Sequence, residues 1–158
     1  MNKTLGFIAV AIILVGVGVY FSSSNSAQSE GVLTFQETSY DFGMVPMNNG
    51  NVTHEFIVEN TSQSLVTISE ISTSCMCTTA FLTHENHEIG PFGMSGHDLK
   101  KSPNTTIQPG ERVIVRAVFD PAAHGPSGVG HIERTIYIKT NSSAQPMAQL
   151  SFVANVVR

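Results

Sequence analysis

The sequence predicts an all-β protein, an antiparallel sandwich of about seven strands that follows one N-terminal apolar helix. Three observations support this fold class. Short segments alternate between apolar and polar residues with the period of two that belongs to a strand. Turn-forming residues separate these segments. Beyond the first 21 residues almost no segment shows a helical period.

The N-terminal segment is apolar and uncharged from Leu5 to Phe21, with Lys3 before it. A helix of that length spans about 26 Å, close to the ~30 Å of a bilayer core. No A-x-A cleavage site follows, so residues 1–21 are expected to be an uncleaved anchor rather than a signal segment. Either interpretation places the rest of the chain outside the cytoplasm, facing the periplasm or the extracellular side. An anchor keeps it on the membrane, whereas cleavage would release it as a secreted protein.

The polar residues 22–30, SSSNSAQSE, are expected to form a flexible linker. After them the strand pattern begins, and residues 31–158 are expected to form one domain. Seven segments show the alternation or the β-rich composition of strands: Val32–Phe35, Tyr40–Val45, Asn51–Asn60, Leu65–Ile71, Glu111–Phe119, His131–Lys139 and Ala148–Val157. Seven short strands are typical of an Ig-like sandwich. Along the segment His131–Lys139, Arg134 interrupts an otherwise apolar face.

One long segment lacks the strand pattern. Residues 83–104 (THENHEIGPFGMSGHDLKKSPN) contain His, Met, Gly and Pro in place of alternating apolar residues. A loop of this length within a compact domain is usually functional or disordered. We therefore expect residues 83–104 to form a long loop that carries part of any site.

Composition and motifs exclude several classes of function. The net charge of −4 leaves no basic surface, so nucleic acid is not expected as a partner. The sequence contains no phosphate-binding loop, no dinucleotide fingerprint, no G-x-S-x-G and no H-E-x-x-H. We expect that the protein is not an enzyme.

An ordered set of short motifs resembles a known family. The motifs are Tyr40-Asp41-Phe42-Gly43, Asn60-Thr61, Ser74-Cys75-Met76-Cys77-Thr78, Ile107-Gln108-Pro109-Gly110-Glu111, Phe119-Asp120-Pro121 and Thr140-Asn141. Over residues 33–157 this set resembles the bacterial domain-of-unknown-function family 1573, whose Ig-like folds are related to the sandwich modules of major sperm and cilium-associated proteins. The resemblance implies an exported sandwich and little about chemistry. In that family the motif is commonly S-C-G-C-T, whereas in this chain Met76 stands in place of the glycine.

The chemistry-bearing residues suggest a metal site. Cys75 and Cys77 form a C-x-C pair whose sulfurs would share one face of an extended segment, with Cα atoms about 6.5–7 Å apart. Loops cluster at the two ends of a sandwich, so the Cys segment and the later loop HGPSGVGH are expected to meet at one end. Thiolate and thioether ligands select Cu(I), whereas zinc rarely uses a thioether. The expected ligands are Cys75, Cys77, Met94, His97, His124 and His131.

The resulting hypothesis is a membrane-anchored copper-binding protein for trafficking, delivery or resistance, with Cu(I) preferred and zinc as the alternative ion. Its partners would be the metal ion, a recipient or scaffold protein, and the membrane through the N-terminal helix. Two other functions stay open. A cysteine pair outside the cytoplasm is normally oxidised, and a disulfide across C-x-C closes a small strained ring that could open reversibly. A non-catalytic Ig-like interaction module, using exposed sheet edges, is the other.

Overall fold

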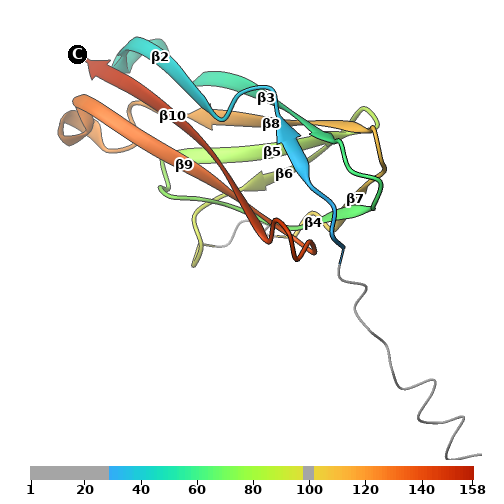
Figure 1. The fold of residues 1–158 in the computed structure, drawn as a ribbon. Coiled ribbons are helices and arrows are strands. Elements are labelled where there is room, and N and C mark those ends of the chain that lie inside the picture. Colours follow the sequence, from blue (N-terminus) through green and yellow to red (C-terminus); the bar gives the residue numbers. More distant parts are fainter. Residues whose placement is uncertain (1–28, 98–101) are drawn as a thin grey trace, which may run out of the picture.

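The computed structural model describes residues 29–97 and 102–158. They form two five-stranded sheets, which pack against each other as a sandwich in Figure 1. The expected anchor 1–21 and most of the expected linker 22–30 lie outside these residues. Within the described part of the chain, no helix is long and apolar enough to cross a membrane. Ser29, at the end of the expected linker, already pairs with Ser142.

Each sheet combines strands from both halves of the chain. The first sheet has the order β1 (Leu33–Phe35), β3 (Val52–Asn60), β8 (Arg112–Phe119), β5 (Thr78–His84) and β6 (His87–Phe92). The second sheet has the order β2 (Ser39–Pro46), β10 (Met147–Val157), β9 (Gly130–Thr140), β4 (Val66–Thr73) and β7 (Thr105–Ile107). Neighbouring strands are antiparallel except β2 and β10, which are parallel. Two short 3-10 helices, η1 (Met47–Asn49) and η2 (Gly125–Gly128), lie in connections.

The core lies between the sheets and is built by alternate residues of each strand. Along β8, for example, Val113, Val115, Ala117 and Phe119 are buried, whereas the residues between them are partly exposed. This alternation is the pattern that the sequence shows, because successive side chains of a strand point to opposite faces. The largest fully buried side chains are Phe56, Phe92 and Phe152.

The sandwich predicted from the sequence is confirmed, but the strand number of about seven is too low. All seven predicted strands are present, and ten strands occur among the described residues. The three additional strands are β5, β6 and β7. Their sequences lack the usual strand pattern. β5 faces the core with Thr78, Ala80 and Leu82, of which only the last is a typical strand-core residue. β6 contains Gly90 and Pro91, and β7 has three residues.

The expected loop 83–104 is therefore wrong in its first half. β5 ends at His84 and β6 begins at His87, so Glu85 and Asn86 form a tight hairpin turn with positive φ. Positive φ at both central residues suits the twist of a two-residue hairpin. The segment without a strand begins after Phe92, and residues 98–101 within it lie outside the described part of the chain.

Candidate functional site: the Cys75–Cys77 pair

The two cysteines lie where the chain passes from one sheet to the other. β4 ends at Thr73 in the second sheet, and β5 begins at Thr78 in the first. We call the residues between them, 74–77, the C-x-C turn. It is a turn rather than an extended segment because the N–H of Thr78 donates to the carbonyl of Cys75 over 3.1 Å. The Cα atoms of the two cysteines are consequently 5.3 Å apart, closer than the extended spacing expected from the sequence.

Thr73 holds the C-x-C turn from inside the protein. Its side chain is buried, and its hydroxyl lies 3.0 Å from the carbonyl oxygens of both Cys75 and Thr78. At the other end of the turn, the N–H of Asp120 donates to the carbonyl of Cys77 over 2.9 Å. These bonds satisfy backbone groups that would otherwise be buried without partners. The turn is therefore fixed to both sheets.

The structure pairs Cys75 and Cys77 as a disulfide. The sequence left their oxidation state open. Cys77 is buried, with 3% of its surface exposed, whereas Cys75 is partly exposed. Met76 between them points to solvent and is 59% exposed. One sulfur of the pair is thus near the surface and the other is inside.

Two basic side chains from distant segments approach the two sulfurs. Nε2 of His124 lies 3.2 Å from Sγ of Cys75, and Nε of Arg134 donates to Sγ of Cys77 over 3.0 Å. His124 stands in the β8–β9 connection, just before η2. That connection begins with Asp120, whose carboxylate accepts the N–H of Ala122 over 2.8 Å, a local bond that turns the chain back toward the cysteines.

Arg134 is a site residue that the sequence analysis did not assign. It occupies an inward-facing position of β9, between Ile132 and Ile136. The sequence contained the signal, since Arg134 interrupts the apolar face of that strand. A charged residue on a core face requires polar partners, and Arg134 donates through Nε to the buried sulfur of Cys77 and through Nη1 to the carbonyl of Glu133 over 2.7 Å.

The structure brings together three of the six expected ligands. The ligand atoms of Cys75, Cys77 and His124 lie within 4.8 Å of one another. The expected meeting of the Cys segment with the loop HGPSGVGH is thus confirmed at His124. The backbone of Met94 pairs with Thr73, which places this residue beside the turn.

His97 and His131 do not join that group. His97 is exposed in a turn, its N–H donating to the carbonyl of Met94 over 3.3 Å. His131 is exposed on β9, three residues from Arg134. Because strand side chains alternate between faces, His131 and Arg134 point to opposite sides of the sheet. The imidazole of His131 is therefore directed away from Cys77.

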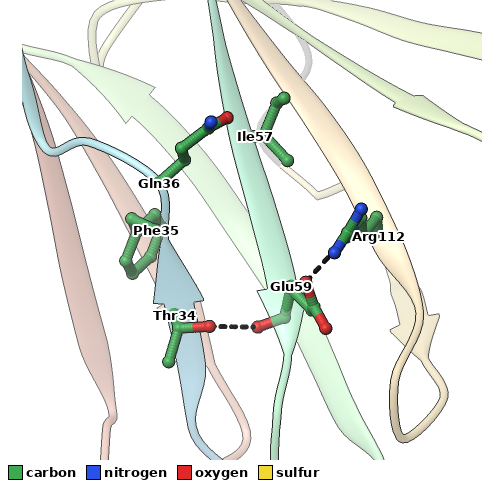
Figure 2. A pocket seen from close by; sticks show the side chains of 6 residues that line it. All are labelled: Thr34, Phe35, Gln36, Ile57, Glu59 and Arg112. Atoms are coloured by element: carbon green, nitrogen blue, oxygen red, sulfur yellow. Dashed lines mark hydrogen bonds and ion pairs between the residues drawn. The ribbon is translucent and has the colours of Figure 1, made fainter.

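A surface pocket of about 390 Å³ lies at the edge of the first sheet, around β1. Figure 2 shows its lining residues, with Arg112 paired to Glu59 at 2.7 Å. Arg112 and Phe119 are at opposite ends of β8, and Phe119 pairs with Thr78 beside the C-x-C turn. At the rise of a strand this places the pocket about 20 Å from the disulfide. The pocket and the sulfur site are separate features.

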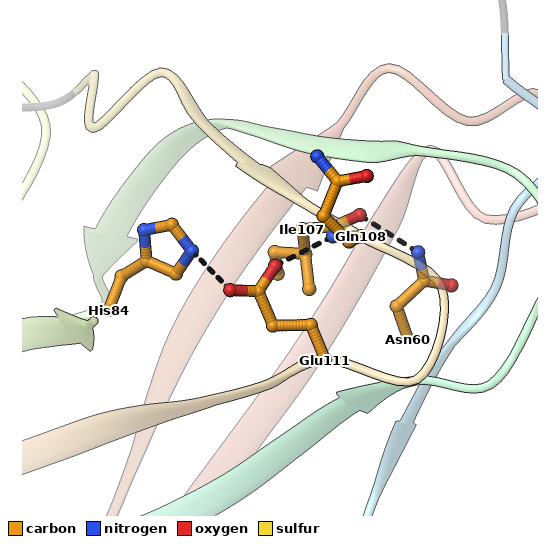
Figure 3. A network of polar contacts seen from close by, with 5 residues as sticks. All are labelled: Asn60, His84, Ile107, Gln108 and Glu111. Carbon is orange, nitrogen blue, oxygen red and sulfur yellow. Dashed lines mark hydrogen bonds and ion pairs between the residues drawn. The ribbon is translucent and has the colours of Figure 1, made fainter.

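A second cluster of metal-ligand side chains consists of His84, Glu85 and Glu111. Figure 3 shows that Glu111 is already engaged: one carboxylate oxygen accepts the N–H of Gln108 over 2.7 Å, and the other accepts Nε2 of His84 over 2.8 Å. The same turn bonds to buried Asn60, whose amide donates to the carbonyl of Ile107 over 2.9 Å. One carboxylate oxygen thus holds the turn and the other joins it to the end of β5, and we assign this cluster a structural role.

Comparison with known proteins supports the fold. Residues 33–93 match the family model described as a protein of unknown function, DUF1573. The resemblance seen in the sequence motifs is confirmed over this part of the chain, which includes the C-x-C turn. No curated protein shows significant sequence similarity.

Several solved structures are similar. A protein of unknown function from Porphyromonas gingivalis W83 is 18% identical with a TM-score of 0.60, covering 84% of this chain and 50% of its own. The VesB protease of Vibrio cholerae is 14% identical with a TM-score of 0.54, covering 86% of this chain and 34% of its own. A PapD-like domain of human CEP192 is 11% identical with a TM-score of 0.47, covering 86% of this chain and 92% of its own. The chain thus spans half or less of the first two, and at the identities of these two the likeness shows the fold alone.

The Thr73→Val variant tests how the C-x-C turn is held. Valine keeps the shape of the side chain but leaves the carbonyls of Cys75 and Thr78 without their hydroxyl partner. We expect the free energy of unfolding to fall by about 1–3 kcal/mol, the cost of losing a buried hydrogen-bond donor. Urea unfolding measures it. Thr79→Val on the outer face of β5 is the matched control, and an equal effect in both variants would contradict the assignment to Thr73.

The Glu111→Gln variant tests the turn network. The pKa of Glu111 lies below its ordinary value of 4.5, mainly because the N–H of Gln108 donates to the carboxylate and further because His84 does, whereas burial opposes them. A lowered folded-state pKa stabilises the fold above the ordinary value, and this contribution is lost as pH falls through the folded-state pKa. We expect the variant to be less stable at pH 7 by about 1 kcal/mol.

The difference between wild type and Glu111→Gln should shrink as the pH of the unfolding experiment is lowered below 4.5, the ordinary value. Glu55→Gln, at an exposed position of β3, is the control and should show no comparable difference. A Glu111→Gln effect that is constant across this pH range would show that the charge of Glu111 contributes nothing.

Proposed function

We propose that this domain is a thiol–disulfide redox module whose Cys75–Cys77 pair cycles between disulfide and dithiol. The observation that carries the proposal is the pairing of the two cysteines with a basic side chain beside each sulfur: His124 at Cys75 and Arg134 at Cys77. A purely structural disulfide needs no such neighbours. A basic neighbour stabilises the thiolate, which is the form that takes part in exchange.

The position of the pair also supports a redox function. A structural disulfide stabilises a fold by linking distant parts of the chain, and its effect grows with the loop that it closes. Cys75 and Cys77 are two residues apart, so their bond closes a minimal loop. Thr73 and the strand pairing already hold the turn without it. The bond therefore contributes little to folding, and its chemistry is the better reason for its presence.

We further propose that the domain works outside the cytoplasm, held at the membrane by the apolar segment Leu5–Phe21. Disulfides persist in oxidising compartments, which agrees with the oxidised pair. A membrane-impermeant maleimide should label the reduced pair in intact cells. Labelling that appears only after lysis would contradict this location.

The redox proposal predicts that the pair titrates as a reversible two-electron couple in the full-length protein. Equilibration in thiol–disulfide buffers, followed by alkylation and mass spectrometry, counts the free thiols at each potential. We expect none or two alkylated cysteines, with a midpoint above about −300 mV, since structural disulfides lie below that value. Cys75→Ser/Cys77→Ser is the control for labelling. A pair that stays oxidised at every potential would contradict the proposal.

A second candidate function is Cu(I) binding by the reduced pair. The observation that favours it is the proximity of three soft or borderline ligand atoms, those of Cys75, Cys77 and His124, within 4.8 Å. Thiolates select Cu(I), whereas structural zinc sites use four ligands. Metal trafficking, delivery or resistance would follow from this activity, with a recipient protein as the partner.

The copper candidate predicts that the reduced full-length protein binds Cu(I) and that His124→Ala weakens binding by about tenfold, since one ligand in three is lost. Competition with a chromogenic Cu(I) chelator measures the affinity. His131→Ala is the matched control, because His131 points away from Cys77, and it should bind as wild type does. Unchanged binding by Cys75→Ser/Cys77→Ser would remove this candidate.

A further inference from the structure

The two sulfurs of the disulfide differ in access and in surroundings. Cys75 is partly exposed at the surface of the C-x-C turn, whereas Cys77 is buried with only 3% of its surface exposed. The guanidinium of Arg134 contacts the buried sulfur through Nε at 3.0 Å. The hydroxyl of Thr78 lies 3.8 Å from the same sulfur. The pair therefore has a distinct outer and inner atom.

We propose that the disulfide is attacked at one sulfur only: the thiolate of a dithiol partner attacks Sγ of Cys75, and Cys77 leaves as a thiolate held by Arg134. This inference rests on the redox function proposed above. Exchange depends on which sulfur a thiolate can reach and on how well the leaving thiolate is stabilised. Cys75 meets the first condition and Cys77 meets the second.

Arg134 stabilises the negative charge that forms on the buried sulfur of Cys77 when the disulfide opens. A thiolate at a buried position is unfavourable unless it is paired and hydrogen-bonded. The guanidinium is always charged and donates along its N–H bond, so it can hold the negative charge as it develops. No comparable charge is needed at Cys75, whose sulfur is near solvent. The inward-facing position of Arg134 in β9 thus has a chemical reason.

The reaction balances over two steps. In the first, a partner thiolate forms a bond to Sγ of Cys75, the Cys75–Cys77 bond breaks, and its electron pair leaves on Cys77. In the second, the partner's other thiolate attacks the partner sulfur of the mixed disulfide and releases Cys75 as a thiolate, which takes a proton from solvent. The partner dithiol is oxidised to a disulfide, and the cysteine pair gains two electrons.

The geometry also indicates why the partner carries two thiols. In the mixed disulfide, the Cys77 thiolate remains in the same short turn as Cys75, with Cα atoms that are 5.3 Å apart in the disulfide form. A nucleophile held in place reacts at a high effective concentration. Cys77 therefore expels a monothiol and restores the disulfide, whereas a dithiol completes the second step within its own mixed disulfide.

Single-cysteine variants of the full-length protein test which sulfur is accessible. Cys77→Ser leaves Cys75, and Cys75→Ser leaves Cys77. With a small aromatic disulfide as the probe, we expect Cys75 to form a mixed disulfide at least about tenfold faster than Cys77, because attack requires access to the sulfur. The two rates should converge in denaturant. An equal or faster rate at Cys77 in the folded protein would overturn the inference.

Arg134 variants test the leaving group. We expect Arg134→Gln to slow reduction of the disulfide by dithiothreitol about tenfold and Arg134→Lys to recover part of the rate, because lysine keeps the charge. The equilibrium should shift about tenfold toward the disulfide, equivalent to about 30 mV. Arg116→Gln is the matched control, since Arg116 is a strand residue paired with Glu88.

The outcomes separate this inference from the function on which it rests. A wild-type pair that does not titrate reversibly removes the redox function itself. A pair that titrates reversibly, but whose reduction rate and equilibrium are unchanged in Arg134→Gln, removes only the assignment of Cys77 as the leaving sulfur. Glutathione buffered at the same potential as dithiothreitol should reduce the pair more slowly, and equal rates would overturn the requirement for a dithiol.

Discussion

The candidate site depends on one constraint, the passage of the chain from β4 to β5 through the four residues of the C-x-C turn. Thr73 and Thr78 belong to different sheets, so the turn spans the end of the sandwich. The buried hydroxyl of Thr73 lies within hydrogen-bond distance of the carbonyls of Cys75, in the turn, and Thr78, just after it. Together with the N–H of Asp120, which donates to the carbonyl of Cys77, this hydroxyl fixes the position of the sulfurs relative to both sheets. The side chains of His124 and Arg134 can contact the sulfurs because the turn holds them at this end of the sandwich.

The remaining parts of the site follow from sheet topology. β8 ends beside Cys77, because Thr78 pairs with Phe119. The connection that follows must return to the second sheet at the same end, and it carries His124. β9 then runs alongside β4, with Ile136 opposite Thr73, so Arg134 lies just beyond the end of β4. Segments distant in sequence are thus brought to the sulfurs by the same crossing between sheets.

The sequence predicts the framework better than the site. All seven expected strands are found because alternating burial determines both the sequence pattern and the structure. β5 is not predicted because Thr78 and Ala80, two of its three core-facing residues, are not typical of a strand core. His124 is predicted, since loops meet at the ends of a sandwich. His131 is not distinguishable from it by composition, because only strand register directs its side chain outward. In the sequence Arg134 is recognisable because it interrupts the apolar face of its strand. Its contact with Cys77 could not be predicted, because it depends on the pairing of β9 with β4.

The two candidate functions compete for the same atoms, and Arg134 bears on both. A disulfide offers no thiolate, so metal binding requires prior reduction, and the redox state of the pair decides whether a metal site exists. Two thiolates with one Cu(I) carry a net charge of −1, which the guanidinium beside Cys77 complements. The metal-free reduced pair, with Cys75 protonated and Cys77 as a thiolate, carries the same charge of −1, so the guanidinium complements both reduced states. Arg134 would therefore favour the reduced pair over the uncharged disulfide, without distinguishing the metal-free form from the Cu(I) form.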